Sequence, residues 1–246
     1  VDSTRVTHDG PVKRESDIKA EMIEFINKDP LKAPVTVHIG TNAARMVTTV
    51  DAYGETGRDT VVFGASMKFT KRVLDKVGRR NGAGLKDHAR KEYGREILNY
   101  SANAVGANNI LSGTTDRQAL LITGTHNELM SIVNRLIENN DQKNLGFMNP
   151  QNYKFIVSQT GIPGSERGYR KLIDFLERRG YEYIISHASG HGGRQDISDM
   201  LDMVGARYGM ATHGDFAQRE HSVTLMREKN ISPINPSEQD IIQISD

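Results

Sequence analysis

Short apolar runs rich in β-branched residues alternate with segments of helical periodicity along almost the whole chain of 246 residues. Continuous apolar strands separated by amphipathic helices are typical of a parallel sheet with helices on both faces. The sequence therefore predicts an α/β fold with a mostly parallel sheet. The expected strands are Val35–Gly40, Thr60–Gly64, Gln118–Thr123, Tyr153–Val157, Tyr181–Ser186 and Tyr208–Thr212. The expected helices are Lys13–Lys28, Asn42–Glu55, Met67–Arg79, His126–Asn140, Ser165–Arg179, Gln195–Val204 and Asp215–Lys229.

Two segments interrupt this alternation. Arg80–Gly113 is first basic and then rich in Asn, Gly and Ala, and we expect it to hold one helix, His88–Leu98, followed by a loop from Tyr100. Pro233–Pro236 ends the pattern, and Glu238–Ile244 is expected to form a closing strand.

Composition excludes several classes of protein. With 37% hydrophobic and 26% charged residues, the chain is typical of a soluble globular protein and not of a disordered one. No apolar run approaches the roughly 20 residues of a membrane-spanning helix, so we expect no membrane partner. The absence of cysteine excludes disulfides and thiolate metal ligands, and it agrees with the cytoplasmic location that we expect.

Positive charge is concentrated in one part of the chain, although the net charge is only +1. Residues 68 to 95 hold ten Lys or Arg and three acidic residues. Lys68, Arg72, Lys76 and Arg80 recur at four-residue spacing, which places them on one helix face. Such a stripe indicates either a polyanion partner such as RNA or an ordinary solvated face.

Five of the expected strands run into loops of small and polar residues. Ligands bind parallel sheets at the carboxyl ends of the strands, where the amino termini of helices offer free N–H groups to phosphates. Gly and Ser are also common in loops without any ligand. The five loops are Gly40–Asn42, Gly64–Ser66, Thr123–Thr125, Ser158–Gly161 and Ser189–Gly193.

Histidines follow two successive expected strands near the carboxyl end. His191 precedes Gly192, and His213 precedes Gly214. A histidine at the end of a parallel strand points toward the cleft where ligands bind, and imidazole is the commonest metal ligand. Zinc needs three or four protein ligands, so two histidines leave such a site incomplete. His38, by contrast, lies inside an apolar strand, where we expect it to be buried and hydrogen-bonded.

Taken in order, several short motifs resemble those of the β-CASP metallo-β-lactamase nucleases, and most of all the ribonuclease J branch. The most specific element is the pair Ser-Gly-His and His-Gly, about twenty residues apart around a helix. The resemblance spans nearly the whole chain. Its motifs are Asp2–Thr4, Gly64–Met67, Thr123–Glu128, Ile162–Glu166, His187–His191 and Thr212–Asp215.

The resemblance implies a domain organisation. Residues 1–34 would be the end of a first lactamase-like segment with a linker helix, residues 35–180 the β-CASP domain, and residues 181–246 the returning carboxyl-terminal segment of the metallo-β-lactamase domain. The amino-terminal half that carries the family's zinc motif His-x-His-x-Asp-His is not in this sequence. That half would be supplied by the same protein or in trans, which indicates an excised or split protein.

The resemblance also implies roles for single residues. Asp2 and His191 would be catalytic, with Asp2 orienting His191 and favouring its charged form, and His213 would bind zinc, of which the complete enzyme holds two ions. By itself, Asp2–Thr4 is as typical of a turn or a helix cap. The residues expected to contact RNA phosphates are Ser189, Gly190, Gly192, Ser66, Thr125, Lys68 and Arg72.

Some departures from the family's motifs bear on the substrate. Ala65 stands where the family usually has arginine, Thr125–Glu128 replaces the usual Ser-Gln-Gly-Glu, and Asp215 replaces glutamate. The expected function is part of a zinc-dependent ribonuclease, exonuclease (5′-to-3′) or endonuclease, that is inactive as this chain alone. A non-catalytic RNA-binding or assembly subunit and a DNA-directed nuclease stay open, as does a homo-oligomer.

Overall fold

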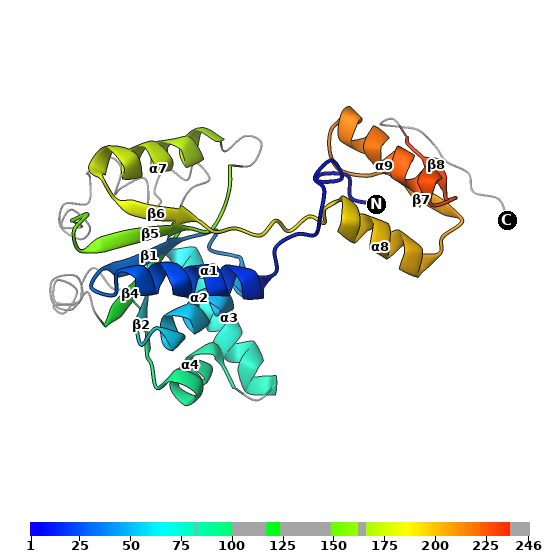
Figure 1. Ribbon diagram of the computed structural model, residues 1–246. Coiled ribbons are helices and arrows are strands. Elements are labelled where there is room, and N and C mark those ends of the chain that lie inside the picture. The colour runs from blue at the N-terminus through cyan, green and yellow to red at the C-terminus, as the bar shows by residue number, and fades with distance from the viewer. Residues whose placement is uncertain (82, 100–116, 124–148, 162–165, 237–246) are drawn as a thin grey trace. The chain divides into compact units, whose positions relative to one another are not determined.

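The computed structural model describes residues 1–81, 83–99, 117–123, 149–161 and 166–236 (Figure 1). These residues form two compact units. One comprises Val1–Lys13 with Ser189–Asp246, and the other comprises Arg14–Ala188. The units are described separately below. The division at residues 34 and 180 that the family resemblance implies stays a prediction about domains.

The larger unit alternates strands and helices as expected. Its described strands are β1 (Ala33–Val37), β2 (Asp59–Val62), β3 (Ile97–Asn99), β4 (Gln118–Ile122), β5 (Tyr153–Val157) and β6 (Glu182–Ile185). Its described helices are α1 (Glu15–Lys28), α2 (Ala43–Glu55), α3 (Ala65–Asn81), α4 (Leu85–Tyr93) and α7 (Glu166–Arg179).

The six strands form one sheet in the order β3-β2-β4-β1-β5-β6, and all neighbours are parallel. The predicted α/β fold with a mostly parallel sheet is therefore confirmed. β1 lies in the middle, where Val37 is in register with Ile122 of β4 and with Val157 of β5. The carboxyl ends of these central strands consequently meet at one edge of the sheet.

Side chains on the two faces of the sheet enter different hydrophobic clusters, as the alternation along a strand requires. Val35, Val37, Phe155 and other alternate strand residues pack against Leu172, Phe175 and Leu176 of α7. The residues between them pack with α1 and α2 or with α2, α3 and α4. Figure 1 shows α7 on one face of the sheet and α1 and α2 on the other.

A buried lysine ends helix α1. Lys154 on β5 is fully buried, and its ammonium donates hydrogen bonds to the carbonyls of Phe25, Ile26 and Asp29 at 2.7–2.9 Å. These carbonyls belong to the last turn of α1 and its carboxyl cap, which have no partners within the helix. Burial lowers the pKa of Lys154 to about 8. The lysine thus ties α1 to the sheet.

A buried arginine connects α1, α2 and β5. Arg45 has no exposed surface, and its guanidinium forms a bidentate pair with Glu15 at 2.9 and 3.0 Å. It also donates to the hydroxyl and the carbonyl of Ser158. The Ser158 hydroxyl in turn donates to the carbonyl of Ser186. Arg45 therefore holds the segments that follow β5 and β6 against the amino end of α1.

His38 is buried just beyond the end of β1, as expected, and it is hydrogen-bonded. Its Nδ1 lies 2.7 Å from the carbonyl of Ile39, so Nδ1 carries the proton and donates it. The other ring nitrogen, Nε2, is buried without a hydrogen-bond partner among the described residues. Burial lowers the pKa of His38 to about 4. The imidazole is therefore neutral at physiological pH.

The basic segment after α3 differs from the prediction. The helix expected at His88–Leu98 is wrong in its bounds, because α4 ends at Tyr93 and is followed by Gly94, which has a left-handed φ of 63°. Gly94 caps the helix, and the chain then forms the edge strand β3, parallel to β2. The α3 helix also begins two residues earlier than expected, so Ser66 lies in its first turn and not in a loop.

The smaller unit contains α8 (Arg194–Val204), β7 (Tyr208–Met210), α9 (Phe216–Glu228) and β8 (Ser232–Ile234). β7 and β8 pair in parallel as a two-stranded sheet. The core of this unit consists of buried apolar residues from the opening segment, both helices and the segments beside the two strands. These residues are Val6, Ile197, Leu201, Ala211, Val223, Leu225, Met226 and Ile231.

Strand β8 is not predicted from the sequence, because Pro233 indicates a break there. Pro233 lies in the middle of β8, which pairs with β7 alone, and an edge strand tolerates proline. The expected strand at Glu238–Ile244 and the expected helix at His126–Asn140 lie outside the described residues.

Candidate active site

His191 is held by the turn that begins α8. It lies two residues before Gly193, the residue at the amino cap of the helix. The Asp196 carboxylate accepts hydrogen bonds from the N–H groups of Gly193 and Val12 at 2.9 and 3.0 Å. We expected His191 to lie directly at the end of a strand. This expectation is inexact, because β6 ends at Ile185, well before His191. The capped helix start positions this histidine.

Asp2 is held beside residue 212 by backbone pairing. Asp2 and Thr212 form an isolated parallel bridge, in which Ser3 N–H donates to the Thr212 carbonyl and Thr212 N–H donates to the Val1 carbonyl. The side chains of Ser3 and Ser222 are fully buried and hydrogen-bonded to each other at 2.8 Å. These contacts place Asp2 next to the residue that follows Thr212, which is His213.

His213 lies in a tight turn between β7 and α9. Its φ is 55°, in the left-handed region that is uncommon for residues other than glycine, and Gly214 has a φ of 78°. The turn is closed by Asp215 and Gln218. The Asp215 carboxylate accepts from the backbone N–H of Gln218, and the side-chain oxygen Oε1 of Gln218 accepts from the backbone N–H of Asp215, both at 2.8 Å. A β-carbon at Gly214 would lie 2.6 Å from that Gln218 oxygen. The turn therefore requires glycine after His213.

Gln218 also contacts the opening segment. Its side-chain amide donates to the carbonyl of Thr4 at 2.9 Å. One side chain thus bonds both the turn that carries His213 and the segment that carries Asp2.

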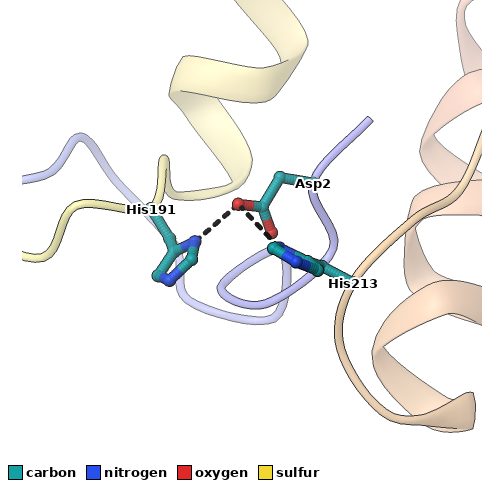
Figure 2. A group of neighbouring side chains, drawn as sticks. All are labelled: Asp2, His191 and His213. Carbon is teal, nitrogen blue, oxygen red and sulfur yellow. Dashed lines mark hydrogen bonds and ion pairs between the residues drawn. The ribbon is translucent and has the colours of Figure 1, made fainter.

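The three side chains meet at one carboxylate oxygen (Figure 2). Oδ2 of Asp2 lies 2.5 Å from Nδ1 of His191 and 3.8 Å from Nδ1 of His213. The two imidazole rings are 6.1 Å apart between centroids and inclined by 73°. Asp2 and His191 are half-buried, whereas the His213 side chain is 73% exposed. The group is therefore open to a large ligand on the His213 side.

Asp2 is held in its charged form. Burial by itself raises the pKa of Asp2, but hydrogen bonds from Thr4 N–H, from His191 and from the Thr4 hydroxyl outweigh it and hold the pKa well below the usual value. Both bonds from Thr4 go to Oδ1, at 2.9 and 2.7 Å. Oδ2 of the ionised carboxylate is left to face the imidazoles.

The donor set fits a zinc ion. Asp2, His191 and His213 each offer one ligand atom, and these atoms lie within 4.8 Å of one another. Two imidazole nitrogens and a carboxylate oxygen are ordinary zinc ligands, and three protein ligands with an open position are typical of catalytic zinc. In this structure, however, Oδ2 of Asp2 already bonds His191. His213, the most exposed of the three, is therefore the side chain most available to an ion.

The phosphate-binding residues predicted beside His191 lie in the same turn. The hydroxyl of Ser189 accepts a hydrogen bond from His191 N–H at 3.0 Å. Gly190 has open space where a side chain would be, and Gly192 lies against Asp196. Ser189 therefore helps to hold the turn, and the backbone at Gly190 is accessible.

The remaining predicted residues belong to the larger unit. Ser66 and Lys68 lie in the first turn of α3 and are half-buried, whereas Arg72, one turn further, is exposed. Thr125 lies outside the described residues, as does the side chain of Arg80. Lys68, Arg72 and Lys76 all lie in α3, so the basic stripe predicted on one helix face is confirmed to be helical for these three residues.

Sequence reasoning named Thr4 only as part of the Asp2–Thr4 motif, without its bonds to Asp2, and it missed Gln218 altogether. A signal for Gln218 was present, because Asp followed three residues later by Gln is the pattern of a capping box at a helix start. No local pattern predicts its contact with Thr4, which joins residues 214 positions apart.

Among the described helices, none is long and apolar enough to cross a membrane. No family model matches the chain. Ribonuclease J2 of Bacillus subtilis (strain 168) is 21% identical over 226 residues, which cover 90% of this chain and 37% of that protein. Ribonuclease J 1 of Streptococcus pyogenes serotype M3 is 26% identical over 200 residues, which cover 79% and 32%. Ribonuclease J of Thermus thermophilus is 24% identical over 221 residues, which cover 87% and 34%.

The chain thus spans about a third of the length of the curated relatives it matches. Its matches extend over most of its own length, as the motifs predicted. The resemblance is therefore confirmed: the chain is a homologue of the ribonuclease J proteins.

Proposed function

We propose that this chain is part of a ribonuclease that hydrolyses phosphodiester bonds in RNA, with Asp2, His191 and His213 at its active site. The observation that carries the proposal is the single carboxylate oxygen shared by two imidazoles, 2.5 and 3.8 Å away. The names of the relatives support RNA as the substrate. Residues far apart in the chain are brought together there, each by its own set of hydrogen bonds.

The pair Asp2–His191 suits proton transfer. In the proposed acid, Nδ1–H of His191 donates a hydrogen bond to Asp2. The other ring nitrogen, Nε2, is directed away from the carboxylate and also carries a proton, because both nitrogens of an imidazolium do. The oxygen that leaves the phosphorus atom needs a proton, and an imidazolium close to it supplies one near neutral pH. Asp2 then stabilises the charged imidazole and fixes its orientation.

His213 would be the metal ligand of this chain. A zinc ion held there would supply Lewis-acid chemistry toward a phosphoryl oxygen. Since one exposed histidine and a carboxylate that is already paired form a weak site, tight binding requires ligands beyond these three residues. We expect calorimetry with zinc chloride to detect only weak binding to the 246-residue chain. A tight stoichiometric site would contradict this expectation.

The turn around His191 would contact the RNA backbone. Gly190 N–H and Gly192 N–H lie next to the catalytic histidine, and open space at Gly190 lets a phosphate approach. In the larger unit, Ser66, Lys68 and Arg72 at the start of α3 provide a hydroxyl and two cations for further phosphates. Backbone contacts of this kind bind RNA without reading its sequence.

The complete gene product would act as a 5′-to-3′ exonuclease, an endonuclease or both, whereas the chain alone would be inactive because its zinc site is incomplete. The test is RNA cleavage by the complete gene product carrying His191→Asn. We expect cleavage at least about 100-fold slower, since acid–base catalysis contributes about 10²–10⁴, and unchanged affinity for single-stranded RNA.

His221→Asn is the matched control, because His221 is an exposed histidine of α9 in the same unit. It should cleave at the wild-type rate. If His191→Asn stays within threefold of wild type, the proposed role of His191 is wrong. If the wild-type complete product binds RNA without cleaving it, the chain belongs to a non-catalytic RNA-binding subunit instead.

A further inference from the structure

Helix α3 carries a row of exposed apolar side chains. Phe69, Val73 and Val77 are 58%, 41% and 51% exposed and follow one another at four-residue spacing. The side chains that α3 buries include Met67, Thr70 and Lys71. Four-residue spacing aligns the three apolar side chains along one face of the helix. This face is therefore a continuous apolar row that the described residues of the larger unit leave exposed.

A row of cations runs directly beside it. Lys68, Arg72 and Lys76 each precede one residue of the apolar row, and Arg72 and Lys76 are exposed. The only acidic residue of α3, Asp75, is engaged by Lys71 at 2.7 Å and by Lys86 N–H at 2.9 Å. Within the described part of the chain, no ion pair engages Arg72 or Lys76. Their charge is therefore available to an anionic partner.

The two rows border a groove with a volume of about 620 Å³. The Arg72 guanidinium carbon lies 5.9 Å from the centre of the Phe69 ring, so a cation and an aromatic face lie side by side in this groove. The groove thus joins an apolar surface to a cationic rim. Among the described residues, its lining comprises Phe69, Arg72, Val73, Asp75 and Lys76.

We propose that this α3 groove binds single-stranded RNA, with a base stacked on Phe69 and the backbone phosphates paired with Arg72 and Lys76. Single-strand sites combine a cationic groove that follows the phosphates with aromatic side chains on which bases stack. The charge of the groove complements that of RNA, and the Phe69 ring complements the apolar face of a base. The proposal rests on the proposed ribonuclease function and assigns it a substrate-holding surface.

The form of the groove favours unpaired RNA over a duplex. In a duplex the bases are stacked on one another and their faces are inaccessible, so Phe69 gains no partner. In a single strand a base can turn toward the ring while its phosphate stays near Arg72. Binding should therefore depend on the Phe69 ring for single strands only.

The test measures fluorescence anisotropy of a labelled 12-nucleotide oligouridine and of a 12-base-pair RNA duplex with the 246-residue chain. Phe69→Ala should weaken binding of the oligouridine at least about fivefold, because loss of stacking on one aromatic side chain costs that much or more. Phe69→Tyr keeps an aromatic ring and should stay within threefold of wild type. Phe216→Ala removes a phenylalanine of the smaller unit that is even more exposed, at 68%, and should have no effect.

The charge row is tested by salt dependence. Arg72→Gln with Lys76→Gln should weaken binding and lower the slope of log affinity against log salt by about 1.4, since each phosphate contact of a single strand contributes about 0.7. Arg170→Gln with Lys171→Gln is the control, because these residues line a separate groove beside α7. The control should leave the slope unchanged.

An affinity of Phe69→Ala within twofold of wild type, with the fold intact by circular dichroism, would overturn the proposal. Equal weakening for duplex and single strand would overturn it too, because stacking would then not be the cause. If instead Phe69→Ala leaves oligouridine binding unaffected and Val73→Glu abolishes self-association of the chain, the exposed face of α3 is a protein contact. Failure of the α3 groove proposal would not change the cleavage rates expected for His191→Asn and wild type. The groove proposal and the proposed ribonuclease function can therefore fail separately.

Discussion

Thr4 donates two hydrogen bonds to Oδ1 of Asp2, from its amide at 2.9 Å and from its hydroxyl at 2.7 Å. Because these bonds engage Oδ1, the other oxygen faces the imidazoles of His191 and His213. A carboxylate that is free to rotate would present either oxygen. Thr4 therefore selects the orientation in which Asp2 meets His191.

Replacing Thr4 by valine removes the hydroxyl donor and retains the amide and the branched shape. We expect cleavage by the complete gene product to fall about tenfold, since a hydrogen bond to a charged group contributes about 1.5–3 kcal/mol. Thr4→Ser keeps the hydroxyl and should restore most of the rate. Single-turnover cleavage checks this, and equal rates for the valine and serine variants would show that the hydroxyl has no part.

Gln218 should stabilise the His213 turn against the opening segment. Gln218→Leu loses the bonds to Thr4 and Asp215 but retains the helix residue. We expect hydrogen exchange at residues 212–219 to become at least about fivefold faster, because loss of a helix-capping contact costs about 1 kcal/mol. Gln195→Leu, which removes an exposed contact with Asp199 on α8, is the control. Equal protection in both variants would mean that Gln218 does not hold the turn.

Arg45 should be among the side chains on which the larger unit depends most. Arg45→Met leaves the Ser158 carbonyl and part of the Glu15 carboxylate without their partner. We expect the free energy of unfolding to fall by about 3 kcal/mol, as for other broken buried ion pairs. Arg90→Met breaks an exposed pair with Glu96 and should cost far less stability than Arg45→Met. Urea unfolding measures both, and similar losses would contradict the structural role of Arg45.

His38 should make the stability of the chain sensitive to mild acid. Its pKa falls from 6.5 in the unfolded chain to about 4 in the fold because it is buried. Between these values the unfolded state binds more protons, so stability is lost as the pH falls from 6.5 toward 4. At pH 5 the loss from this group is about 2 kcal/mol relative to pH 7.5.

His38→Gln removes the titrating group, so its unfolding free energy should change less between pH 7.5 and pH 5 than that of the wild type. His221→Gln, on the exposed face of α9, should behave like the wild type. Urea unfolding at the two pH values decides between these outcomes. An identical pH dependence of His38→Gln and wild type would contradict the burial of a neutral His38.

The sequence predicts the central sheet well because buried parallel strands are short, apolar and β-branched. β5 has the expected bounds, and β1, β2, β4 and β6 differ from expectation by only a few residues. β3 and β8 were missed for different reasons. The apolar pair Ile97 and Leu98 also fits the end of a helix, and Pro233 hides an edge strand whose pairing with β7 depends on tertiary structure.

The side chains of the candidate site were predicted only through the resemblance to known motifs. Periodicity does not reveal the backbone bridge between Asp2 and Thr212, because these residues are more than 200 positions apart. It does not reveal the left-handed turn at His213 either, because that turn depends on an unusual φ. Lys154 and Arg45 are charged, which predicts exposure, yet both are fully buried. Their partners are backbone carbonyls, one carboxylate and the Ser158 hydroxyl, which only the folded chain brings near.

The most direct test of the account is a double-mutant cycle of Asp2→Asn and His191→Asn in the complete gene product, measured by single-turnover cleavage of single-stranded RNA. If Asp2 acts through His191, each single variant should lose about 100-fold or more, and the double variant should lose little beyond the larger single loss. Losses that multiply, so that the double variant falls by the product of the two, would show that the residues act independently and would contradict the account.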